Sequence, residues 1–511
     1  MRRITADSRG ALLAFSVAAA GGIACSLLVA TGGPILHARW TLLLELGLWA
    51  VAWLTAVIAV FRLPRRLAVV LVIGAAVGLR AVALVGTPNT SDDLYRYAWD
   101  GRVQAHGIDP YTGPPLAPEL SKLRDPWLWP DAAGCAALAR PPGCTRINRP
   151  ADRTIYPPVA EAWFTVVHEV GGEGGHDKAW QVAGLVTDTV VIGLLMLALR
   201  RWRRDPRWVG LYALCPAAVF EFVHNAHVDG LAVAFMVAAL VVVVPPDEKP
   251  ASAARDVAVG LLIGAAALVK LYPAALLLVM LCLPRARPWR SLVRASGAAA
   301  ALSAITYAPH IHAVGLRVVG YLPGYLREEH YGGGGRFLLA GVLGLPGPAA
   351  TAVAGIALVS VLSWIVWRRP DAPRAAAIVL VTLFLVTTPV QPWYAVSAVA
   401  LGSLAGWPAP AAVVVAGYPY YFAVILDYRH GVRLAQLCYG AALAFVVAGA
   451  VGRRLRGPDT REVERPAAVE AAIARRPVPR GEHGQSGAVS IDEGLESAGR
   501  SLAGGTLQHR A

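Results

Sequence analysis

Charged residues are scarce in this sequence, and two common active-site motifs of soluble enzymes are absent from it. Asp, Glu, Lys and Arg make up 16% of the 511 residues, whereas soluble domains carry about 25%. The sequence has no Gly-x-x-x-x-Gly-Lys phosphate loop and no His-Glu-x-x-His zinc motif. Apolar runs recur instead, and their length of about 20 residues is typical of membrane-spanning helices. We therefore find no soluble catalytic domain and predict a polytopic membrane protein.

Negative charge is in deficit, and the formal net charge is +14. In a soluble protein this excess would suggest a nucleic-acid partner, but here the arginines gather at the ends of apolar runs. That distribution is typical of membrane orientation, so we expect membrane lipids and no nucleic acid as partners. If the basic clusters are cytoplasmic, both termini are cytoplasmic and the polar insert 87–177 is extracytoplasmic. The clusters lie at 2–9, 62–66, 200–204, 285–290, 368–374 and 453–456.

The apolar runs predict an all-α protein of roughly 12–14 transmembrane helices in a cell membrane. The first run is too long for a typical signal peptide and is expected to be retained. Segment 157–170 either spans the membrane or lies at its interface. The other spans are expected near 11–31, 41–61, 67–86, 178–199, 207–222, 226–244, 255–284 (a pair), 290–309, 350–367, 374–388, 393–406, 409–426 and 431–451.

Three parts follow from this pattern. Residues 1–66 hold N-terminal helices, and residues 67–456 form the core with its outer loop 87–177. Residues 457–511 are rich in Arg, Glu, Gly and Ala without an apolar period, so we predict a disordered cytoplasmic tail. Of the six cysteines, only Cys135 and Cys144 lie in the outer loop. An exported location permits a disulfide between them, and two free thiols are the alternative.

The outer loop opens with a predicted helix over residues 91–106. Ser and Asp at its start cap free N–H groups, and acidic residues favour the positive end of the helix dipole. Asp93, Arg96, Tyr97 and Asp100 are spaced to share one helical face. A polar face just outside a span looks into water or into a polar cavity. A solvated helix face is the simpler alternative.

Three short motifs in this loop carry a family resemblance. They are Asp-x-x-x-Tyr at Asp93–Tyr97, Gly-x-Asp-Pro-Tyr at Gly107–Tyr111 and Tyr-Pro-Pro at Tyr156–Pro158. With the span pattern from about residue 65 to 450, they resemble the GT-C class of polytopic membrane glycosyltransferases. The nearest members are the actinobacterial polyprenol-phosphate-mannose-dependent mannosyltransferases, including glycosyltransferase family 87. One difference is that the family usually has its acidic loop after the first span, whereas here two further apolar runs come earlier.

The resemblance implies a GT-C fold and a reaction outside the membrane. A sugar, with mannose expected, would pass from a polyprenyl phosphate to a hydroxyl group of a glycolipid or glycan. The departing lipid phosphate needs positive charge, and the hydroxyl needs one carboxylate base for inverting displacement, unlike a retaining glycosidase. The motif makes Asp93 that base, with Asp92 as the alternative. No cofactor is expected, although a divalent metal remains possible.

A second function is open: a transporter or flippase of a lipid-linked glycan. Transporters place polar groups near the bilayer midplane and often contain internal repeats. Here the polar groups concentrate at one predicted face, and no clear repeat is visible. These features favour the enzyme.

Binding residues are expected around the base. Arg96 would position Asp93 or a phosphate, or form only an ion pair with Asp92 or Asp100. Polar groups at membrane depth are costly and usually functional, although capping and unspecific metal ligation are alternatives for residues 224–229. Lys270 would meet phosphate or extend toward the interface. The full set of candidates is Arg96, Tyr97, Asp109, Tyr111, Tyr156, His224, Asn225, His227, Asp229, Lys270, Arg327, His330, Arg336, Gln391 and Trp393.

Overall fold

The computed structural model describes residues 6–243, 252–329, 337–425 and 430–455, in which helices are the only regular secondary structure. The first half contains α1 (Ala6–Thr31), α2 (Ile35–Val60), α3 (Arg65–Ala83), α4 (Asp93–Ala105), η1 (Pro118–Leu123), α5 (Ala132–Ala137), α6 (Pro158–Gly171), α7 (His176–Arg201), η2 (Pro206–Trp208), α8 (Val209–Ala213), η3 (Ala218–His224) and α9 (Asp229–Val242). The second half contains α10 (Ala253–Ala267), η4 (Tyr272–Cys282), α11 (Pro288–Val314), η5 (Gly315–Val319), α12 (Leu322–Glu328), α13 (Leu338–Gly341), α14 (Gly347–Arg368), α15 (Ala372–Val386), α16 (Pro392–Ala405), α17 (Ala411–Ile425) and α18 (Gly431–Leu455). The predicted tail 457–511 lies outside the described residues.

Six described helices are long and apolar enough to cross a membrane: α1, α2, α3, α7, α14 and α18. Each corresponds to a predicted span, and together they make the chain a multi-pass membrane protein. The pair η3 and α9 adds a seventh candidate if its 120° bend is counted within one span. The prediction of 12–14 spans counted shorter apolar helices as well, such as α15, α16 and α17. In α16 every residue except Tyr394 is buried, because a helix enclosed by protein can be apolar on all sides.

Helix α2 illustrates how the long helices pack. Leu42, Leu46 and Trp49 recur every three or four residues and are buried. Leu44 and Leu48 lie on the other side of the helix and are 63% and 54% exposed. One face therefore packs into the bundle, and the other is an apolar surface of the kind that contacts lipid.

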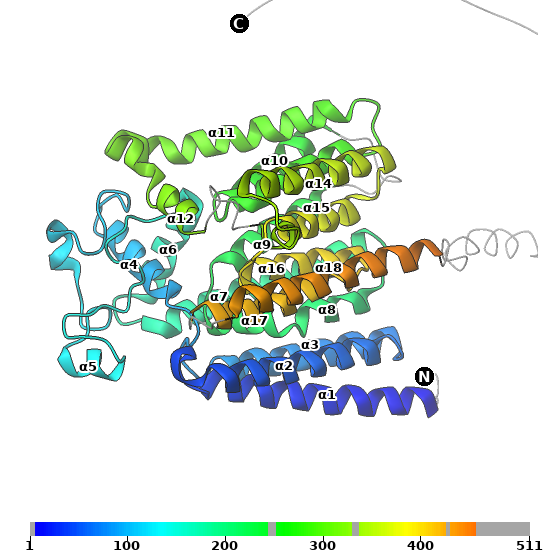
Figure 1. Ribbon diagram of the computed structural model, residues 1–511, viewed down its shortest axis with the longest axis horizontal. Helices are drawn as coiled ribbons and strands as arrows, with labels where there is room; N and C mark the ends of the chain where they lie inside the picture. The colour runs from blue at the N-terminus through cyan, green and yellow to red at the C-terminus, as the bar shows by residue number, and fades with distance from the viewer. Residues whose placement is uncertain (1–5, 244–251, 330–336, 426–429, 456–511) are drawn as a thin grey trace, which may run out of the picture. The chain divides into compact units, whose positions relative to one another are not determined.

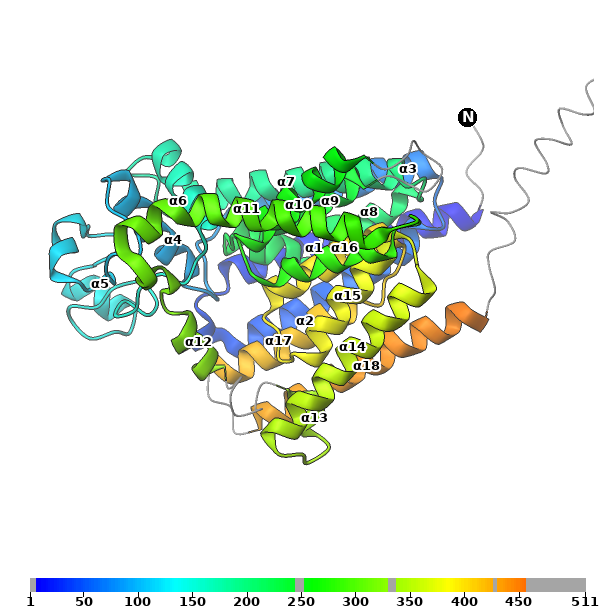
Figure 2. The same ribbon diagram turned by 90° about the horizontal axis from the view of Figure 1, so that it is seen from above.

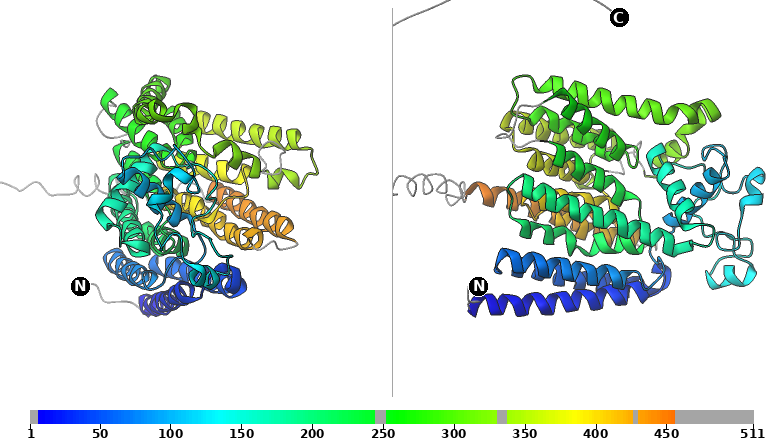
Figure 3. Two further views of the ribbon diagram at one scale, coloured as in Figure 1. Left: turned by 90° about the vertical axis from the view of Figure 1, so that its left-hand side faces the viewer. Right: turned by 180° about the vertical axis from the view of Figure 1, so that it is seen from behind.

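The insert lies at one end of the helix bundle. Figures 1 and 3 show α4, α5 and α6 gathered at this end, while α1 begins at the opposite end. Basic clusters meet at that opposite end, since Arg207 donates to the Phe61 carbonyl (2.7 Å) and Arg204 pairs with Asp371 (2.7 Å). This separation of acidic insert from basic turns is the one that the charge pattern predicts.

Segment 157–170, whose status was open, forms α6 and packs against α4 at the insert end (Figure 2). The contact depends on Gly101, because a Cβ atom there would lie 2.5 Å from the Phe164 carbonyl oxygen. Next to it the Tyr97 ring stacks on Phe164 at a centroid distance of 4.5 Å. Helix α6 thus supports α4 from behind and holds its first turn in place.

The predicted disulfide is confirmed. Cys135 and Cys144 are bonded, with their Cα atoms 5.8 Å apart. The bond closes a short loop that includes the end of α5. It therefore constrains the part of the insert that leads toward residues 145–148.

Candidate functional site

A cavity of about 1020 Å³ lies where the insert meets the helix bundle. Polar stretches that are far apart in sequence line it together: residues 87–96, 146–157, 270–272, 321–329 and 390–394. The turn of residues 224–229 reaches it through His227, whose Nδ1 lies 3.5 Å from Asp93 Oδ2. The cavity thus brings together polar stretches of the predicted extracytoplasmic insert and of four more distant parts of the chain.

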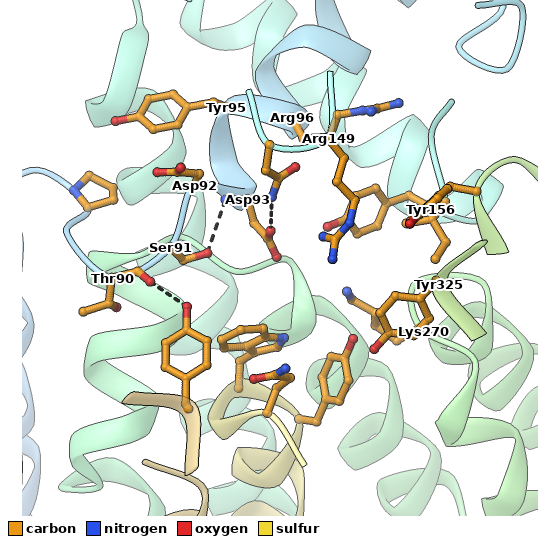
Figure 4. A pocket seen from close by; sticks show the side chains of 18 of the residues that line it. Thr90, Ser91, Asp92, Asp93, Tyr95, Arg96, Arg149, Tyr156, Lys270 and Tyr325 are labelled. Atoms are coloured by element: carbon orange, nitrogen blue, oxygen red, sulfur yellow. Dashed lines mark hydrogen bonds between the residues drawn. The ribbon is translucent and has the colours of Figure 1, made fainter. Parts of the chain in front are cut away.

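Asp93 is the first residue of α4 and points into the cavity (Figure 4). Its N–H donates to Ser91 Oγ (3.2 Å), so one of the free N–H groups at the start of the helix has a partner. Asn148 Nδ2 donates to Asp93 Oδ1 (2.6 Å). Burial favours the neutral acid, but the adjacent His227, the charge of Lys270 and the Asn148 amide outweigh it. They lower the pKa of Asp93 to about 2, so its carboxylate is ionised at neutral pH.

Asp92 also lines the cavity but has a different partner. Arg140 Nη2 donates to Asp92 Oδ2 (2.7 Å). Desolvation raises the pKa of Asp92 and outweighs the opposing effect of Arg140. The two neighbouring aspartates therefore differ in environment, with Asp93 the more strongly ionised.

A buried polar chain lies behind Asp93. His227 Nε2 lies 3.4 Å from Glu221 Oε2, and Tyr418 donates to Glu221 Oε1 (2.8 Å). The His227 ring stacks on Trp393 at 4.1 Å. The π-helix η3 and the bend before α9 bring Glu221 and His227 into this position, and π-helical turns of this type are frequent at functional sites.

Cationic groups face Asp93 across the cavity (Figure 4). Lys270 Nζ lies 3.8 Å from Asp229 Oδ2 and 4.7 Å from the centre of the Tyr156 ring. Arg149 pairs with Glu328 on α12 at 2.8 Å. A carboxylate that lines this cavity can accept a proton, and the two cations that line it can stabilise an anionic leaving group.

Of the two roles open to Arg96, the structure shows the ion pair with Asp100. Its Nε donates to both carboxylate oxygens of Asp100, at 3.0 and 2.9 Å, and its Nη1 donates to the Asp152 carbonyl. Asp93 and Asp100 share a face with Arg96, but the spacing of four residues favours the pair with Asp100. Asn148, which sequence reasoning missed, is the residue that binds Asp93.

Several other candidates lie outside the cavity lining. Asp109 bonds to His310 (2.7 Å), and Tyr111 donates to the Tyr156 carbonyl (2.6 Å), so both brace the insert. His224 Nδ1 faces the Ala83 carbonyl at 2.8 Å. Arg327 is exposed and is not among the residues that line the cavity.

The remaining candidates divide between the cavity, the buried chain and its surroundings. Gln391 and Trp393 line the cavity, and Tyr97 is buried behind it among aromatic rings. Asn225 donates to Glu221 (3.2 Å) and to Thr90 (2.8 Å). His330 and Arg336 lie outside the described residues.

The residues that sequence reasoning missed come mainly from the stretch before Tyr156. Asn148 and Arg149 lie in the polar run Ile-Asn-Arg-Pro-Ala-Asp-Arg that returns the insert to the membrane. Its density of polar side chains was a signal, but no motif distinguished its members. Across the described ranges, no cluster of three or more His, Cys, Asp or Glu side chains is arranged to hold a metal ion.

Together, the fold and the cavity define a multi-pass membrane protein with a charged site at one end of its helices. Residues 155–389 match the model of glycosyltransferase family 87, which confirms the resemblance that the motifs indicated and supports a membrane glycosyltransferase. The matched range is just under half of the 511 residues and contains His227 and Lys270 but not Asp93.

The chain was also compared with curated proteins and with solved structures. No curated protein matches the chain. Among solved structures, the chain is similar to the crystal structure of ArnT from Cupriavidus metallidurans bound to undecaprenyl phosphate. The identity is 20%, the match covers 81% of each chain, and the TM-score is 0.43.

Proposed function

We propose that the protein transfers a sugar, with mannose expected, from a polyprenyl-phosphate donor to a hydroxyl group of a glycolipid or cell-envelope glycan. The reaction takes place at the extracytoplasmic face. One observation carries the proposal: the ionised Asp93 and the cations Lys270 and Arg149 face the same cavity. A base and an anion site on opposite walls fit a displacement in which a hydroxyl attacks and a lipid phosphate leaves.

In the proposed reaction the acceptor hydroxyl attacks the anomeric carbon of the sugar. Its proton passes to Asp93 as the new glycosidic bond forms. The bond from the anomeric carbon to the phosphate oxygen breaks, and the lipid phosphate leaves with the electron pair. Lys270 and Arg149 stabilise the charge that develops on the phosphate. Because one carboxylate serves as base and none attacks carbon, the configuration inverts.

His227 supports this base from behind. The imidazole lies 3.5 Å from Asp93, and its stacking on Trp393 keeps it beside the carboxylate. A positive partner keeps Asp93 ionised until the hydroxyl arrives. On the opposite wall Asp229 holds Lys270, so the ammonium group is already in place when the phosphate binds.

The test is an assay of purified protein in detergent with radiolabelled polyprenyl-phosphate sugars and glycolipid acceptors. Asp93→Asn keeps the size of the side chain but cannot accept the proton. We expect it to lower turnover by at least roughly 10²-fold while donor binding is retained, and Asp92→Asn to be milder.

The reverse order of the two variants would make Asp92 the base. Full activity of both would remove the catalytic role of this helix. If the parent protein transfers no sugar but moves lipid-linked glycans between the leaflets of vesicles, the transporter alternative replaces the proposal.

A further inference from the structure

The two aspartates at the start of α4 receive their partners from one short segment of the insert. Arg140 donates to Asp92 at 2.7 Å, and Asn148 donates to Asp93 at 2.6 Å. Both partners lie within or just beyond the loop that the Cys135–Cys144 disulfide closes. The closed loop therefore contacts Asp92 through Arg140, and the residues that follow it directly contact Asp93 through Asn148.

The segment is held firmly on both sides of the disulfide. Arg140 N–H donates to the Cys135 carbonyl (2.9 Å), which fixes the chain inside the loop. Thr145 donates through its hydroxyl to the Leu128 carbonyl (2.7 Å), and Ile147 is 2% exposed. Asn148 follows directly, so its position depends on anchors that start at the disulfide.

The two contacts have different chemical consequences. A neutral amide that donates to Oδ1 of Asp93 fixes the plane of the carboxylate, while Oδ2 stays near His227 and the cavity. A guanidinium on Asp92 offsets its charge and holds it to one side. Without Arg140, two carboxylates on adjacent residues would repel each other, and either could meet the acceptor hydroxyl.

We propose that the segment Cys135–Asn148, which begins with the loop that the disulfide closes, is a positioning element that assigns different roles to the two aspartates. Asn148 orients Asp93 toward the reacting hydroxyl, and Arg140 keeps Asp92 out of the reaction. The proposal rests on the proposed function in that it takes Asp93 as the base. It adds that transfer depends on the oxidised state of Cys135 and Cys144.

Reduction of the Cys135–Cys144 disulfide is a two-electron exchange with a dithiol. A dithiol reductant supplies two electrons and two protons, becomes a cyclic disulfide, and leaves Cys135 and Cys144 as thiols. The loop that carries Arg140 then loses its closure. We expect turnover to fall while the donor still binds, because Lys270 and Arg149 lie outside that loop.

The first experiment separates orientation from packing at residue 148. Asn148→Ala should lower kcat by about 10-fold to 10²-fold, with the KM for the donor little changed. Asn148→Asp has the same shape but cannot donate when ionised, so it should be at least as impaired. Parent-like kcat in both variants would overturn the role of Asn148.

A matched pair tests Arg140. Arg140→Lys should recover part of the activity that Arg140→Gln loses, because a lysine can still neutralise Asp92. Arg124→Gln is the control, since Arg124 lies in the same insert, donates to the carbonyls of Pro115 and Ala117 and lies over the Trp129 ring. Equal activity of Arg140→Gln and Arg124→Gln would overturn the role of Arg140.

The disulfide has its own control among the free cysteines. The double variant Cys135→Ser with Cys144→Ser should reproduce the effect of the reductant, and Cys25→Ser with Cys438→Ser should not. Thermal unfolding of each purified variant identifies those that fail to fold. A folded variant without the disulfide that keeps parent turnover would reject the redox dependence.

The second experiment needs no sugar transfer. A water-soluble carbodiimide with an amine labels protonated carboxyl groups, and peptide mapping locates the label. In mildly acidic buffer we expect more label on Asp92 than on Asp93, because His227 and Lys270 face Asp93 and keep it ionised. At Asp92 desolvation outweighs the opposing charges of Arg140 and Arg146, so the pKa of this carboxyl is raised.

In Asn148→Ala the difference in labelling should shrink, because Asp93 loses a hydrogen-bond donor that lowers its pKa. In the reduced protein the label on both aspartates should increase, because Asp92 loses Arg140 and Asp93 loses Asn148. Equal labelling of the two aspartates in the parent would overturn the positioning element. If the parent transfers no sugar yet the labelling difference depends on Asn148 and the disulfide, the proposed function fails and the positioning element stands.

Discussion

The imidazole of His227 lies between two acids, with Nδ1 3.5 Å from Asp93 Oδ2 and Nε2 3.4 Å from Glu221 Oε2. The ring is 1% exposed and packs flat on Trp393. An imidazole enclosed in this way has little freedom to turn, so each nitrogen keeps its own carboxylate. The ionisation of Asp93 therefore depends on a residue from a distant part of the chain.

The pH dependence of turnover should report this contact. In the parent, Asp93 has a pKa of about 2, so it stays ionised throughout roughly pH 4 to 8 and gives no acid limb there. His227→Gln removes the group that lowers this pKa, while burial still raises it. The pKa then rises, and turnover should fall on the acid side below roughly pH 6. His312→Gln, at the exposed end of α11, is the control, and identical profiles for all three proteins would contradict the argument.

Donor affinity should depend on the cations that face the cavity. Lys270→Ala should weaken binding of a sugar-free polyprenyl phosphate by at least about tenfold, since one charge-assisted contact contributes roughly 1.5–3 kcal/mol. Arg149→Ala should act in the same direction, and Lys270→Arg should recover part of the loss. Lys122→Ala, on the exposed η1, is the control. Binding can be followed by isothermal titration in detergent.

Arg327 offers a contrast to Arg149. Both lie near α12, but only Arg149 lines the cavity. Arg327→Ala should leave donor affinity within a factor of two of the parent. A loss as large as that of Arg149→Ala would place the phosphate nearer to α12 than we propose.

Membrane orientation can be tested by cysteine labelling in intact cells. A cysteine at Thr112, in the insert, should react with an impermeant maleimide from outside, and one at Arg203 should react only after the membrane is opened. The basic turns at the opposite end of the bundle are the reason for this expectation. The reverse pattern would place the site in the cytoplasm and remove the proposed reaction.

Glu161 on α6 should make stability depend on pH. Burial and the charge of Asp100 raise the pKa of Glu161 well above its usual range, so the folded protein keeps a proton that the unfolded chain releases. Above about pH 4.3 the unfolded state binds fewer protons, and stability falls as the pH rises until the folded pKa is passed.

Glu161→Gln cannot ionise and avoids this loss. The free energy of unfolding of this variant relative to the parent should therefore increase from pH 5 to pH 8, by up to about 1.4 kcal/mol per pH unit. The difference in melting temperature should increase in the same direction. Thermal unfolding at four pH values measures the difference. A constant difference would show that Glu161 is ionised in the folded protein.

Some features of this protein follow from local sequence alone. The long spans are set by apolar runs of sufficient length, and α4 starts where Ser91 can accept from the Asp93 N–H, which is a contact between near neighbours. The disulfide also follows from the sequence, because only two cysteines lie in the insert. These features depend on residues close together in the chain, so the sequence alone is enough to predict them.

The tertiary structure decided which partner each charged group takes. By helical spacing Arg96 could pair with Asp93 or with Asp100. In the folded chain Arg96 pairs with Asp100, and Asn148 donates to Asp93. His227 and Lys270 come near Asp93 only because a bend and a turn end in the same cavity. Spacing defines the face of a helix, but the groups that pack against that face come from distant residues, and only the folded chain brings them together.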